Sequence, residues 1–351
     1  MKNKKLFTEI LLSWNKNENK REMPWKGEKD PYKIWISEII LQQTRVHQGT
    51  SYYHRFIKSF PDVQSLAGAT EQNVFKHWEG LGYYSRCRNL IASAKFISSK
   101  LNGAFPKTFE DILQLKGIGP YTASAIASFA YNQPHAVVDG NVFRVLSRFF
   151  GIEIPIDTTE GKKKYSILAN DLLDKTTPGI YNQAIMDFGA IVCKPAQPLC
   201  YNCPLQAKCV AFKKKKVNDL PFKKKGIKRR ERFFTYIIAE YNNAVYVRKR
   251  ITKDIWHGLY EFILLETEEL LSEKELPEMK ISKALFGESD LAVISFSKTF
   301  SQKLTHQTIT GKIFHISLAE PLKIEDGYDL LSKEEVELLP FPKFITSYLK
   351  D

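Results

Sequence analysis

The sequence predicts a mainly α-helical N-terminal domain followed by an α/β C-terminal domain. Helix-length apolar patterns joined by short turns fill residues 1–210 and end in a group of four cysteines. Residues 211–232 carry 11 basic and 2 acidic side chains, a composition typical of a charged linker. From residue 233 onward, runs of β-branched and aromatic residues have the length of strands. We therefore expect a helical domain over 1–210, a basic linker over 211–232 and a second domain over 233–351.

In the helical domain, apolar residues recur with the period of an α-helix in six segments. Pro31 suits the first turn of the first segment, because no amide donor is needed there. The expected helices span residues 31–49, 66–78, 90–101, 109–115, 121–131 and 142–149.

In the second domain, four segments are expected to be strands: residues 233–240, 244–250, 292–297 and 312–318. Asn242 and Asn243 lie between the first two, and asparagine tolerates the left-handed backbone of a tight hairpin turn. The tail over 330–349 is expected to hold one or two helices. The predicted second domain is therefore α/β.

The net charge of +13 is unevenly distributed along the chain. Residues 1–210 carry 27 basic and 18 acidic side chains, whereas residues 233–351 carry 14 and 19. This asymmetry indicates a polyanionic partner, of which nucleic acid is the simplest. For the linker alone, a solvated lysine-rich connection is an equally good interpretation. No apolar segment is long enough to span a membrane and no signal peptide is evident, so we expect a cytoplasmic protein without a membrane partner.

Four cysteines close the helical domain with the spacing C-x6-C-x2-C-x5-C. They are Cys193, Cys200, Cys203 and Cys209, and the only other cysteine is Cys87. Disulfides or a structural zinc ion are alternative interpretations. Disulfides have little support without a signal peptide, and zinc sites usually show two short C-x2-C pairs, of which this chain has one. The spacing favours a [4Fe–4S] cluster.

A glycine-containing turn between two predicted helices is suited to phosphate binding. Gly117 and Gly119 permit a tight turn with uncovered amides, and the next helix begins directly after them. An ordinary helix–helix turn is the alternative. Further along, two apolar residues, Val137 and Val138, precede Asp139. The Asp139 carboxylate is therefore expected in a loop with Gly140 and Asn141, just before another helix.

The segments LKGIGPYTASAI (115–126) and VVDGNVFRVLSR (137–148), followed by the four cysteines, resemble the helix-hairpin-helix DNA glycosylases that carry an iron–sulfur cluster. The segments 21–26, 30–46 and 80–90 are similar to adenine DNA glycosylases of the MutY type. The resemblance is strong over residues 6–210 and loose over 233–351. It implies a monomeric, nucleoid-associated bacterial enzyme of base excision repair. Its substrate would be double-stranded DNA with adenine opposite 8-oxoguanine or guanine, and its product an abasic site.

Glu38 lies in a very apolar stretch, either on the wet face of a helix or in a desolvated pocket that favours a protonated carboxyl. The resemblance implies that Glu38 is the general acid, that Asp139 stabilises the positive sugar and that Asn141 supports Asp139. Tyr121 stands where bifunctional relatives have a lysine that attacks the sugar. Tyrosine cannot form that Schiff base, so a monofunctional enzyme is expected.

Two rival functions remain at this stage. One is a bifunctional, endonuclease III-like glycosylase and lyase for oxidised pyrimidines. The other is a non-catalytic DNA-binding iron–sulfur module, which would need neither of the two carboxylates.

The resemblance also implies residues that contact the two bases. It places Gln43, Thr44 and Tyr83 inside the duplex, with Gly117 and Gly119 on the backbone. The implied adenine pocket consists of Arg21, Trp25 and Gln183. This chain departs from the family pattern there, with Met23 for leucine and Lys26 for arginine, and the second change removes a bidentate contact.

Residues 233–351 resemble the Nudix-like domain of the same family, with 256–262 similar to its strand segment. The expected metal-binding helix is replaced by ETEELLSEKELPEM (266–279), so we expect binding without nucleotide hydrolysis. The resemblance implies that this domain senses 8-oxoguanine, through Thr305 and His306. The alternative register uses Phe300, Ser301 and Gln302.

Overall fold

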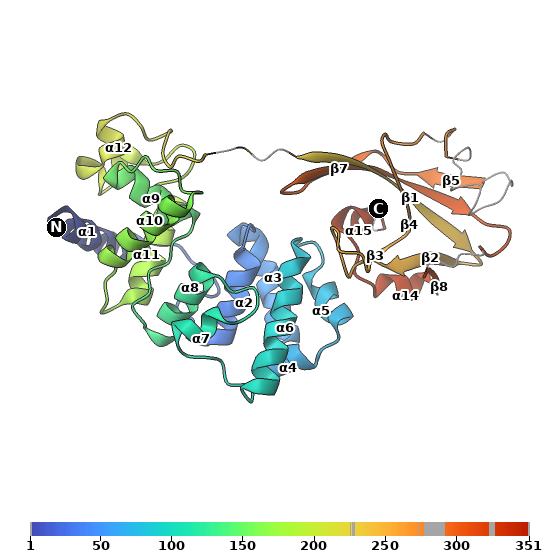
Figure 1. The fold of residues 1–351 in the computed structure, drawn as a ribbon, viewed down its shortest axis with the longest axis horizontal. Helices are drawn as coiled ribbons and strands as arrows, with labels where there is room; N and C mark the ends of the chain where they lie inside the picture. Colours follow the sequence, from blue (N-terminus) through green and yellow to red (C-terminus); the bar gives the residue numbers. More distant parts are fainter. Residues whose placement is uncertain are drawn as a thin grey trace. The chain divides into compact units, whose positions relative to one another are not determined.

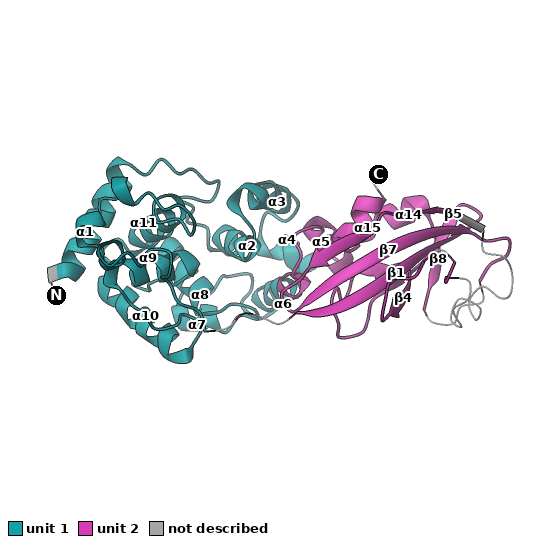
Figure 2. Ribbon diagram, turned by 90° about the horizontal axis from the view of Figure 1, so that it is seen from above, with its two compact units in different colours: residues 1–69, 88–225 teal, residues 70–87, 226–351 magenta. Residues whose placement is uncertain are grey.

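The computed structural model describes residues 2–224, 226, 229–272, 274–276, 292–322 and 327–349. The chain forms two compact units, one of residues 1–69 and 88–225 and the other of residues 70–87 and 226–351 (Figure 2). The first unit is helical, and the second contains all the strands of the described residues (Figure 1). The short segment 70–87 therefore joins the C-terminal part of the chain.

The helices of the first unit follow one another with short connections. They are α1 (Lys2–Asn17), α2 (Pro31–Leu41), α3 (Val46–Ser59), α4 (Val63–Gly68), α7 (Phe109–Leu113), α8 (Pro120–Tyr131), α9 (Gly140–Phe150), α10 (Thr159–Leu172), α11 (Pro178–Ile191) and α12 (Val210–Lys213). In the second unit lie α5 (Glu71–Trp78) and the start of α6 (Tyr84–Lys100). The segments that we predicted from 90 to 149 are confirmed as helices, within a few residues at their ends.

Two predicted helices are each divided in the structure. The prediction of one helix over 31–49 was wrong, because α2 ends at Leu41 and α3 begins at Val46. Gln43 interrupts the helix with a left-handed backbone, φ 59°. The prediction over 66–78 was also wrong as a single helix, since Thr70 accepts a hydrogen bond from the amide of Asn73 and thereby caps a new helix, α5.

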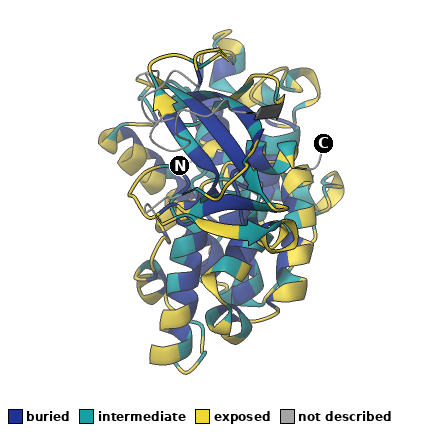
Figure 3. Ribbon diagram, turned by 90° about the vertical axis from the view of Figure 1, so that its right-hand side faces the viewer, coloured by how far each residue is buried: buried dark blue, intermediate teal, exposed yellow. Residues whose placement is uncertain are grey.

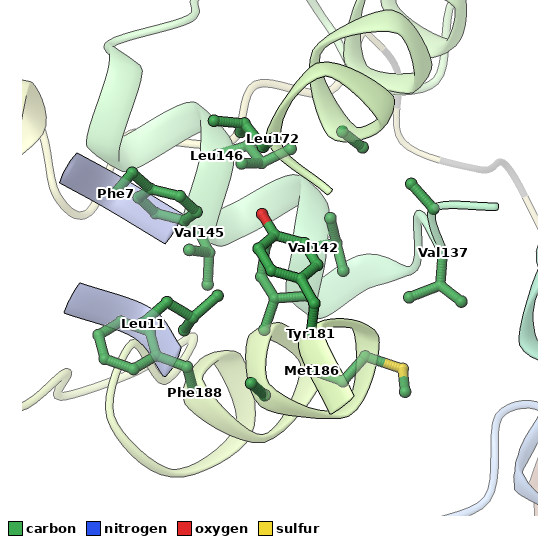
Figure 4. Packing of buried hydrophobic residues seen from close by; sticks show 14 of the residues in the cluster. Phe7, Leu11, Val137, Val142, Val145, Leu146, Leu172, Tyr181, Met186 and Phe188 are labelled. Carbon is green, nitrogen blue, oxygen red and sulfur yellow. The ribbon is translucent and has the colours of Figure 1, made fainter. Parts of the chain in front are cut away.

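One apolar core of the first unit lies where α1, α9 and α11 meet (Figure 4). Phe7 and Leu11 of α1, Val145 of α9 and Phe188 of α11 are all buried there. Trp14 completes the contact, with its ring edge-on to Phe188 at 4.9 Å between centroids. This core fixes α9 and α11, the two helices that bear most of the polar residues described below.

The second unit is built on one mixed sheet, with strand order β3-β2-β1-β7-β5. Its strands are β1 (Arg230–Tyr241), β2 (Ala244–Lys249), β3 (Tyr260–Glu261), β4 (Ile263–Thr267), β5 (Ala292–Phe296), β6 (Phe300–Lys303), β7 (Gln307–Ser317) and β8 (Asp329–Ser332). The long strands β1 and β7 pair in parallel, and the remaining pairs are antiparallel. Most of β1 from its middle onward is buried, as expected for a central strand, and Figure 3 shows strands that are coloured as buried.

The four strands predicted in this unit are confirmed in outline as β1, β2, β5 and β7. The hairpin turn is confirmed as well, since Asn242 and Asn243 both have positive φ between paired residues Tyr241 and Ala244. Strands β4, β6 and β8 were not predicted, whereas β3 lies within residues 256–262, where the resemblance implied a strand. The tail forms two short helices, α14 (Lys333–Glu337) and α15 (Lys343–Tyr348). Part of the segment 266–279 lies outside the described residues, as do residues 280–291.

Candidate active site

Glu38 is a buried carboxylic acid on the wall of a cavity. It lies on α2, with 6% of its surface exposed. Trp25, Ile34 and Gln183 line the same cavity, whose volume is about 200 Å³. The pKa of Glu38 is raised to about 7: desolvation raises it most, a hydrogen bond with Tyr121 lowers it, and the negative charge of Asp139 raises it. A substantial fraction of the Glu38 carboxyl therefore keeps its proton near pH 7.

Tyr121 stands in the first turn of α8, next to Glu38. Burial, followed by the charges of Glu38 and Asp139, raises the pKa of its phenol well above the usual value. The hydroxyl oxygen also lies 3.5 Å from the sulfur of Met186. Tyr121 thus stays a neutral hydroxyl near both carboxyl groups.

Asp139 caps the N-terminus of α9. Its carboxylate accepts hydrogen bonds from the amides of Asn141 and Val142, both at 2.8 Å, and from the side chain of Asn141 at 2.7 Å. Burial raises the pKa of Asp139, while these three donors and the charge of Arg144 oppose the shift. All three hydrogen bonds favour the ionised form and fix the direction of the carboxylate.

Arg144 connects the Asp139 loop to the start of the cysteine loop. Its guanidinium donates to the Asn141 side chain at 2.8 Å, to the Gly189 carbonyl at 2.6 Å and to the Cys193 carbonyl at 2.7 Å. A planar guanidinium can satisfy several acceptors at once in fixed directions, which an ammonium cannot. Arg144 therefore fixes Asn141 relative to α11 and Cys193.

Asp187 is the centre of a buried polar group at the side of the cavity. Its side chain has no exposed surface and accepts from Arg21 at 2.7 Å and from Gln183 at 2.9 Å. Lys26 lies 3.2 Å from the same carboxylate, and Asn19 donates to it at 2.9 Å. A buried carboxylate needs such partners. The arrangement orients Arg21 and Gln183, two of the predicted pocket residues, while Trp25 packs edge-on to Tyr53.

The predicted phosphate-binding turn joins α7 to α8. Gly117 has φ 83°, and a Cβ there would lie 2.6 Å from the Cβ of Asn89, so the turn requires glycine. Gly119 is the N-cap of α8 and offers no side chain to the first-turn amides, and nothing lies within 4 Å of the place of its missing Cβ. The N-terminus of α8 is therefore accessible to an anion.

All four predicted cysteine ligands line one small cavity. Its volume is about 30 Å³, and its other lining residues are mostly apolar. The thiols of Cys193, Cys200, Cys203 and Cys209 are free and partly buried. The Arg148 guanidinium, itself buried, lies 3.5 Å from the Cys193 sulfur and donates to the Lys194 carbonyl at 2.8 Å.

Two of the residues predicted to enter DNA each have a left-handed backbone conformation. Gln43 is exposed with φ 59°, and Tyr83 is 43% exposed with φ 49°. Thr44, beside Gln43, is partly buried. Left-handed backbone in non-glycine residues is uncommon and is often found at binding sites. The strain therefore marks the same two exposed side chains that the resemblance singled out.

The predicted lesion-sensing residues lie at the tip of the β6–β7 hairpin. Leu304 closes the turn by donating to the Gln307 carbonyl at 2.8 Å, and His306 is exposed between them. The Thr305 hydroxyl lies 3.2 Å from the Tyr83 hydroxyl. In the alternative register, the Phe300 ring stacks on Phe344 at 4.0 Å, so it is occupied by packing. Thr305 and His306 thus lie at the tip of a hairpin, and the choice between the two registers stays a prediction.

Comparisons with known proteins agree with this geometry. The model of the HhH-GPD superfamily of base excision DNA repair proteins matches residues 36–168, and the NUDIX domain model matches residues 234–351. An adenine DNA glycosylase of Buchnera aphidicola subsp. Schizaphis graminum is 32% identical over 335 residues, which cover 95% of each chain. The chain belongs to the adenine DNA glycosylase family. The mouse adenine DNA glycosylase is 42% identical over 217 residues, covering 59% of this chain and 42% of the mouse protein.

Solved structures show the same fold for the helical part. A thermostable thymine-DNA glycosylase has a TM-score of 0.57 and 28% identity, covering 61% of this chain and 98% of that one. An endonuclease III trapped on DNA has a TM-score of 0.53 and covers 60% of this chain and 98% of that one. At 21% identity, the second likeness concerns the fold alone. The predicted helix-hairpin-helix fold and Nudix-like domain, and the class of base excision repair glycosylase, are confirmed.

Within this adenine DNA glycosylase family member, the structure brings Glu38, Tyr121, Asp139 and Asn141 together. Two residues that organise them, Asp187 and Arg144, were not predicted from the sequence. A signal for Asp187 was present: it is the only acid in the apolar helix α11, one turn after Gln183. No comparable signal marks Arg144, because its partners Gly189 and Cys193 are distant in the sequence. Among the described residues, no helix is both long enough and apolar enough to cross a membrane.

Proposed function

We propose that this enzyme removes adenine from double-stranded DNA by hydrolysis, from mispairs with 8-oxoguanine or guanine, and leaves an abasic site. The observation that carries the proposal is the pair of carboxyl groups with opposite surroundings, Glu38 and Asp139. Glu38 is desolvated and favours the proton, whereas Asp139 accepts three hydrogen bonds. Such a difference supports one acid and one charge-stabilising carboxylate.

In the proposed reaction, Glu38 donates a proton to N7 of an adenine that has left the base stack. The bond between C1′ and N9 then breaks, and its electron pair leaves with the base. The positive charge that develops on the sugar is stabilised by ionised Asp139, which Asn141 holds in place. A water molecule then adds to C1′ of the sugar and releases a proton.

Tyr121 argues for a monofunctional enzyme. A lyase needs an amine that forms an imine with C1′, and tyrosine has none. The phenol lies between Glu38 and Asp139 instead. We therefore infer that the strand stays intact.

The adenine pocket is inferred to be the cavity beside Glu38. Gln183 offers an amide whose direction is set by Asp187 at 2.9 Å, and Trp25 offers an apolar wall. Arg21 is held by the same carboxylate. Lys26, which replaces the usual arginine, reaches Asp187 and the Arg21 carbonyl at 2.7 Å. It thereby supports the position of Arg21.

We infer that the turn at Gly117 and Gly119 binds the DNA backbone through uncovered amides. Gln43, Thr44 and Tyr83 would occupy the space left by the flipped adenine, and Thr305 and His306 would contact the opposite 8-oxoguanine. The positive charge of the chain suits this partner. We expect a monomer that acts on chromosomal DNA in the cytoplasm, at the bacterial nucleoid.

We infer that the four cysteines hold a [4Fe–4S] cluster. Their free thiols line one cavity with a mostly apolar lining, and four thiolates are the usual ligand set of such a cluster. Arg148 supplies positive charge at Cys193. A bound cluster would tie the cysteine loop together, and the hydrolysis proposed here needs no electron transfer.

The test is the Glu38→Gln variant. We expect it to bind the mispaired duplex with nearly wild-type affinity and to lose base release by about two or more orders of magnitude, as general acids typically contribute. Single-turnover release of free adenine is measured beside the equilibrium affinity. Wild-type release by this variant would overturn the proposed role of Glu38.

A further inference from the structure

Residues 70–87 belong to the same compact unit as residues 226–351, although the two segments are far apart in the sequence (Figure 2). Two side chains at the end of α5 make the attachment. Lys76 donates to the Leu339 carbonyl at 2.9 Å, and the Glu79 carboxylate accepts from the Phe341 amide at 2.9 Å. Lys76 and Glu79 also form an ion pair at 3.4 Å. Both contacts are made to main-chain groups, so they do not depend on the rotamers of the partner residues.

The attached segment is itself firmly held. The Pro340 carbonyl accepts from the Tyr260 amide at 2.9 Å. Phe341 is 1% exposed and its ring stacks on Phe262 at 5.2 Å. The main chain at 339–341 is therefore a rigid support for α5.

A second close contact with α5 is made at Phe75. Gly258 has φ 87°, and a Cβ there would lie 2.7 Å from the Phe75 ring. Only glycine permits this approach without displacement. Together with Lys76 and Glu79, this contact attaches α5 to the C-terminal part of its unit.

The support extends from Glu79 to Tyr83 through a short, well-connected turn. Gly80 and Gly82 have φ 90° and 71°, and the Trp78 indole donates to the Gly82 carbonyl at 3.1 Å. The Arg86 guanidinium lies over the Trp78 and Tyr83 rings, at 5.4 Å and 5.3 Å. Tyr83 is thus held in its left-handed conformation, with its hydroxyl 3.2 Å from that of Thr305.

We propose that Glu79, with Lys76, is a positioning residue for reading the base opposite adenine. By fixing α5 to residues 339–341, it holds Tyr83 beside Thr305, so that the two side chains form one recognition surface. Glu79 itself touches neither base nor sugar. This inference rests on the proposed function, since it concerns the partner of the excised adenine.

The experiment compares two duplexes, with adenine opposite 8-oxoguanine and opposite guanine. For each full-length variant the single-turnover rates of adenine release are measured, and their ratio is taken. The ratio is independent of the folded fraction, because both rates come from one preparation. Glu79→Ala is expected to lower the ratio about fivefold, the order of one typical intramolecular hydrogen bond.

Glu79→Gln is the conservative control, because its amide oxygen still accepts from the Phe341 amide, and it should keep the wild-type ratio. Glu160→Ala removes an exposed glutamate on α10 and should also keep it. Lys76→Met keeps the aliphatic stem, loses the bond to Leu339 and should lower the ratio. It decides the question if Glu79→Ala does not fold.

An unchanged ratio in Glu79→Ala overturns the inference, and so does an equal loss in Glu79→Gln. If the wild-type enzyme releases no adenine from either duplex, the proposed function itself fails. If the wild-type enzyme discriminates between the two duplexes and the Glu79→Ala variant discriminates equally well, only the positioning role of Glu79 is refuted.

Discussion

Glu38 and Asp139 are two carboxyl groups of one site whose surroundings differ at the level of single hydrogen bonds. Glu38 faces an apolar cavity, and Asp139 faces three donors. The sequence predicted both residues, because one lies in an apolar helix and the other before a helix start. The sequence could not predict whether Glu38 lies on a solvated helix face or in a desolvated pocket, since its burial depends on α8 and α9, which are distant in the sequence.

We expect the single-turnover rate of adenine release to fall as pH rises through about 7. Burial raises the pKa of Glu38 to about 7, and only the protonated acid can donate to the base. The rate–pH profile is recorded from about pH 5.5 to about pH 8.5, with DNA affinity measured alongside. A rate that increases over this range, at constant affinity, is incompatible with Glu38 as the acid.

The same raised pKa has a consequence for stability. Below the ordinary glutamate pKa of 4.5 both the native and the unfolded state hold the proton. Between 4.5 and about 7 only the native state keeps it, so the free energy of unfolding falls with rising pH, by up to about 3 kcal/mol. Glu38→Gln removes this loss. It should raise the thermal midpoint at about pH 8 more than at about pH 5. A gain that is independent of pH, or one matched by the exposed Glu160→Gln, contradicts the burial of Glu38.

At the scale of elements, the site depends on the close approach of α9 to α11. A Cβ at Gly189 would lie 2.6 Å from the Cβ of Asn141. Arg144 connects the two helices, because its planar guanidinium donates both to the Asn141 side chain and to the Gly189 carbonyl. This contact could not be predicted from the sequence, because periodicity identifies helices but not which of their faces meet.

Gly189→Ala is expected to displace Asn141 and to slow adenine release at least about tenfold, with a loss of stability of about 1–3 kcal/mol from overpacking. Gly68→Ala is the matched control, since nothing lies within 4 Å of a Cβ there. Single-turnover rates and unfolding midpoints are compared. Equal rates for Gly189→Ala and the wild type would show that the loop tolerates the shift.

Some helix boundaries are set by local sequence signals, and others are set by tertiary contacts. Asp139 and Pro120 give local start signals, and α8 and α9 were predicted closely. The end of α2 has no such signal, because Gln42, Gln43 and Thr44 are all compatible with a helix. The left-handed Gln43 is set by its surroundings, and it is a residue that we assign to DNA contact.

At the scale of the whole molecule, the chain combines a basic first half with an acidic second half. Residues 1–210 and the connector hold the excess of lysine and arginine, including the four successive lysines 213–216, which begin four residues after Cys209. Charge alone predicted a polyanionic partner. It could not predict that residues 70–87 would join the C-terminal unit, because that depends on contacts such as Glu79 with Phe341.

Replacing Lys213, Lys214 and Lys215 by glutamine should weaken DNA binding and reduce the salt slope of log K by up to about 3, if each lysine contacts a phosphate. Lys162, Lys163 and Lys164 of α10 are exposed and provide a control with the same change in charge. Affinities are measured at several salt concentrations. Identical salt slopes for the two triple variants would show that the effect comes from net charge and that Lys213, Lys214 and Lys215 do not contact the DNA.

The most direct test of the account is product analysis of the wild-type enzyme on a duplex with one adenine opposite 8-oxoguanine. Free adenine and strand breakage are measured with and without alkali, and borohydride is added to trap any imine. The account predicts free adenine, breakage only after alkali and no trapped complex, because Tyr121 replaces the lysine of a lyase. Breakage without alkali, a trapped complex, or binding without any adenine release would contradict it.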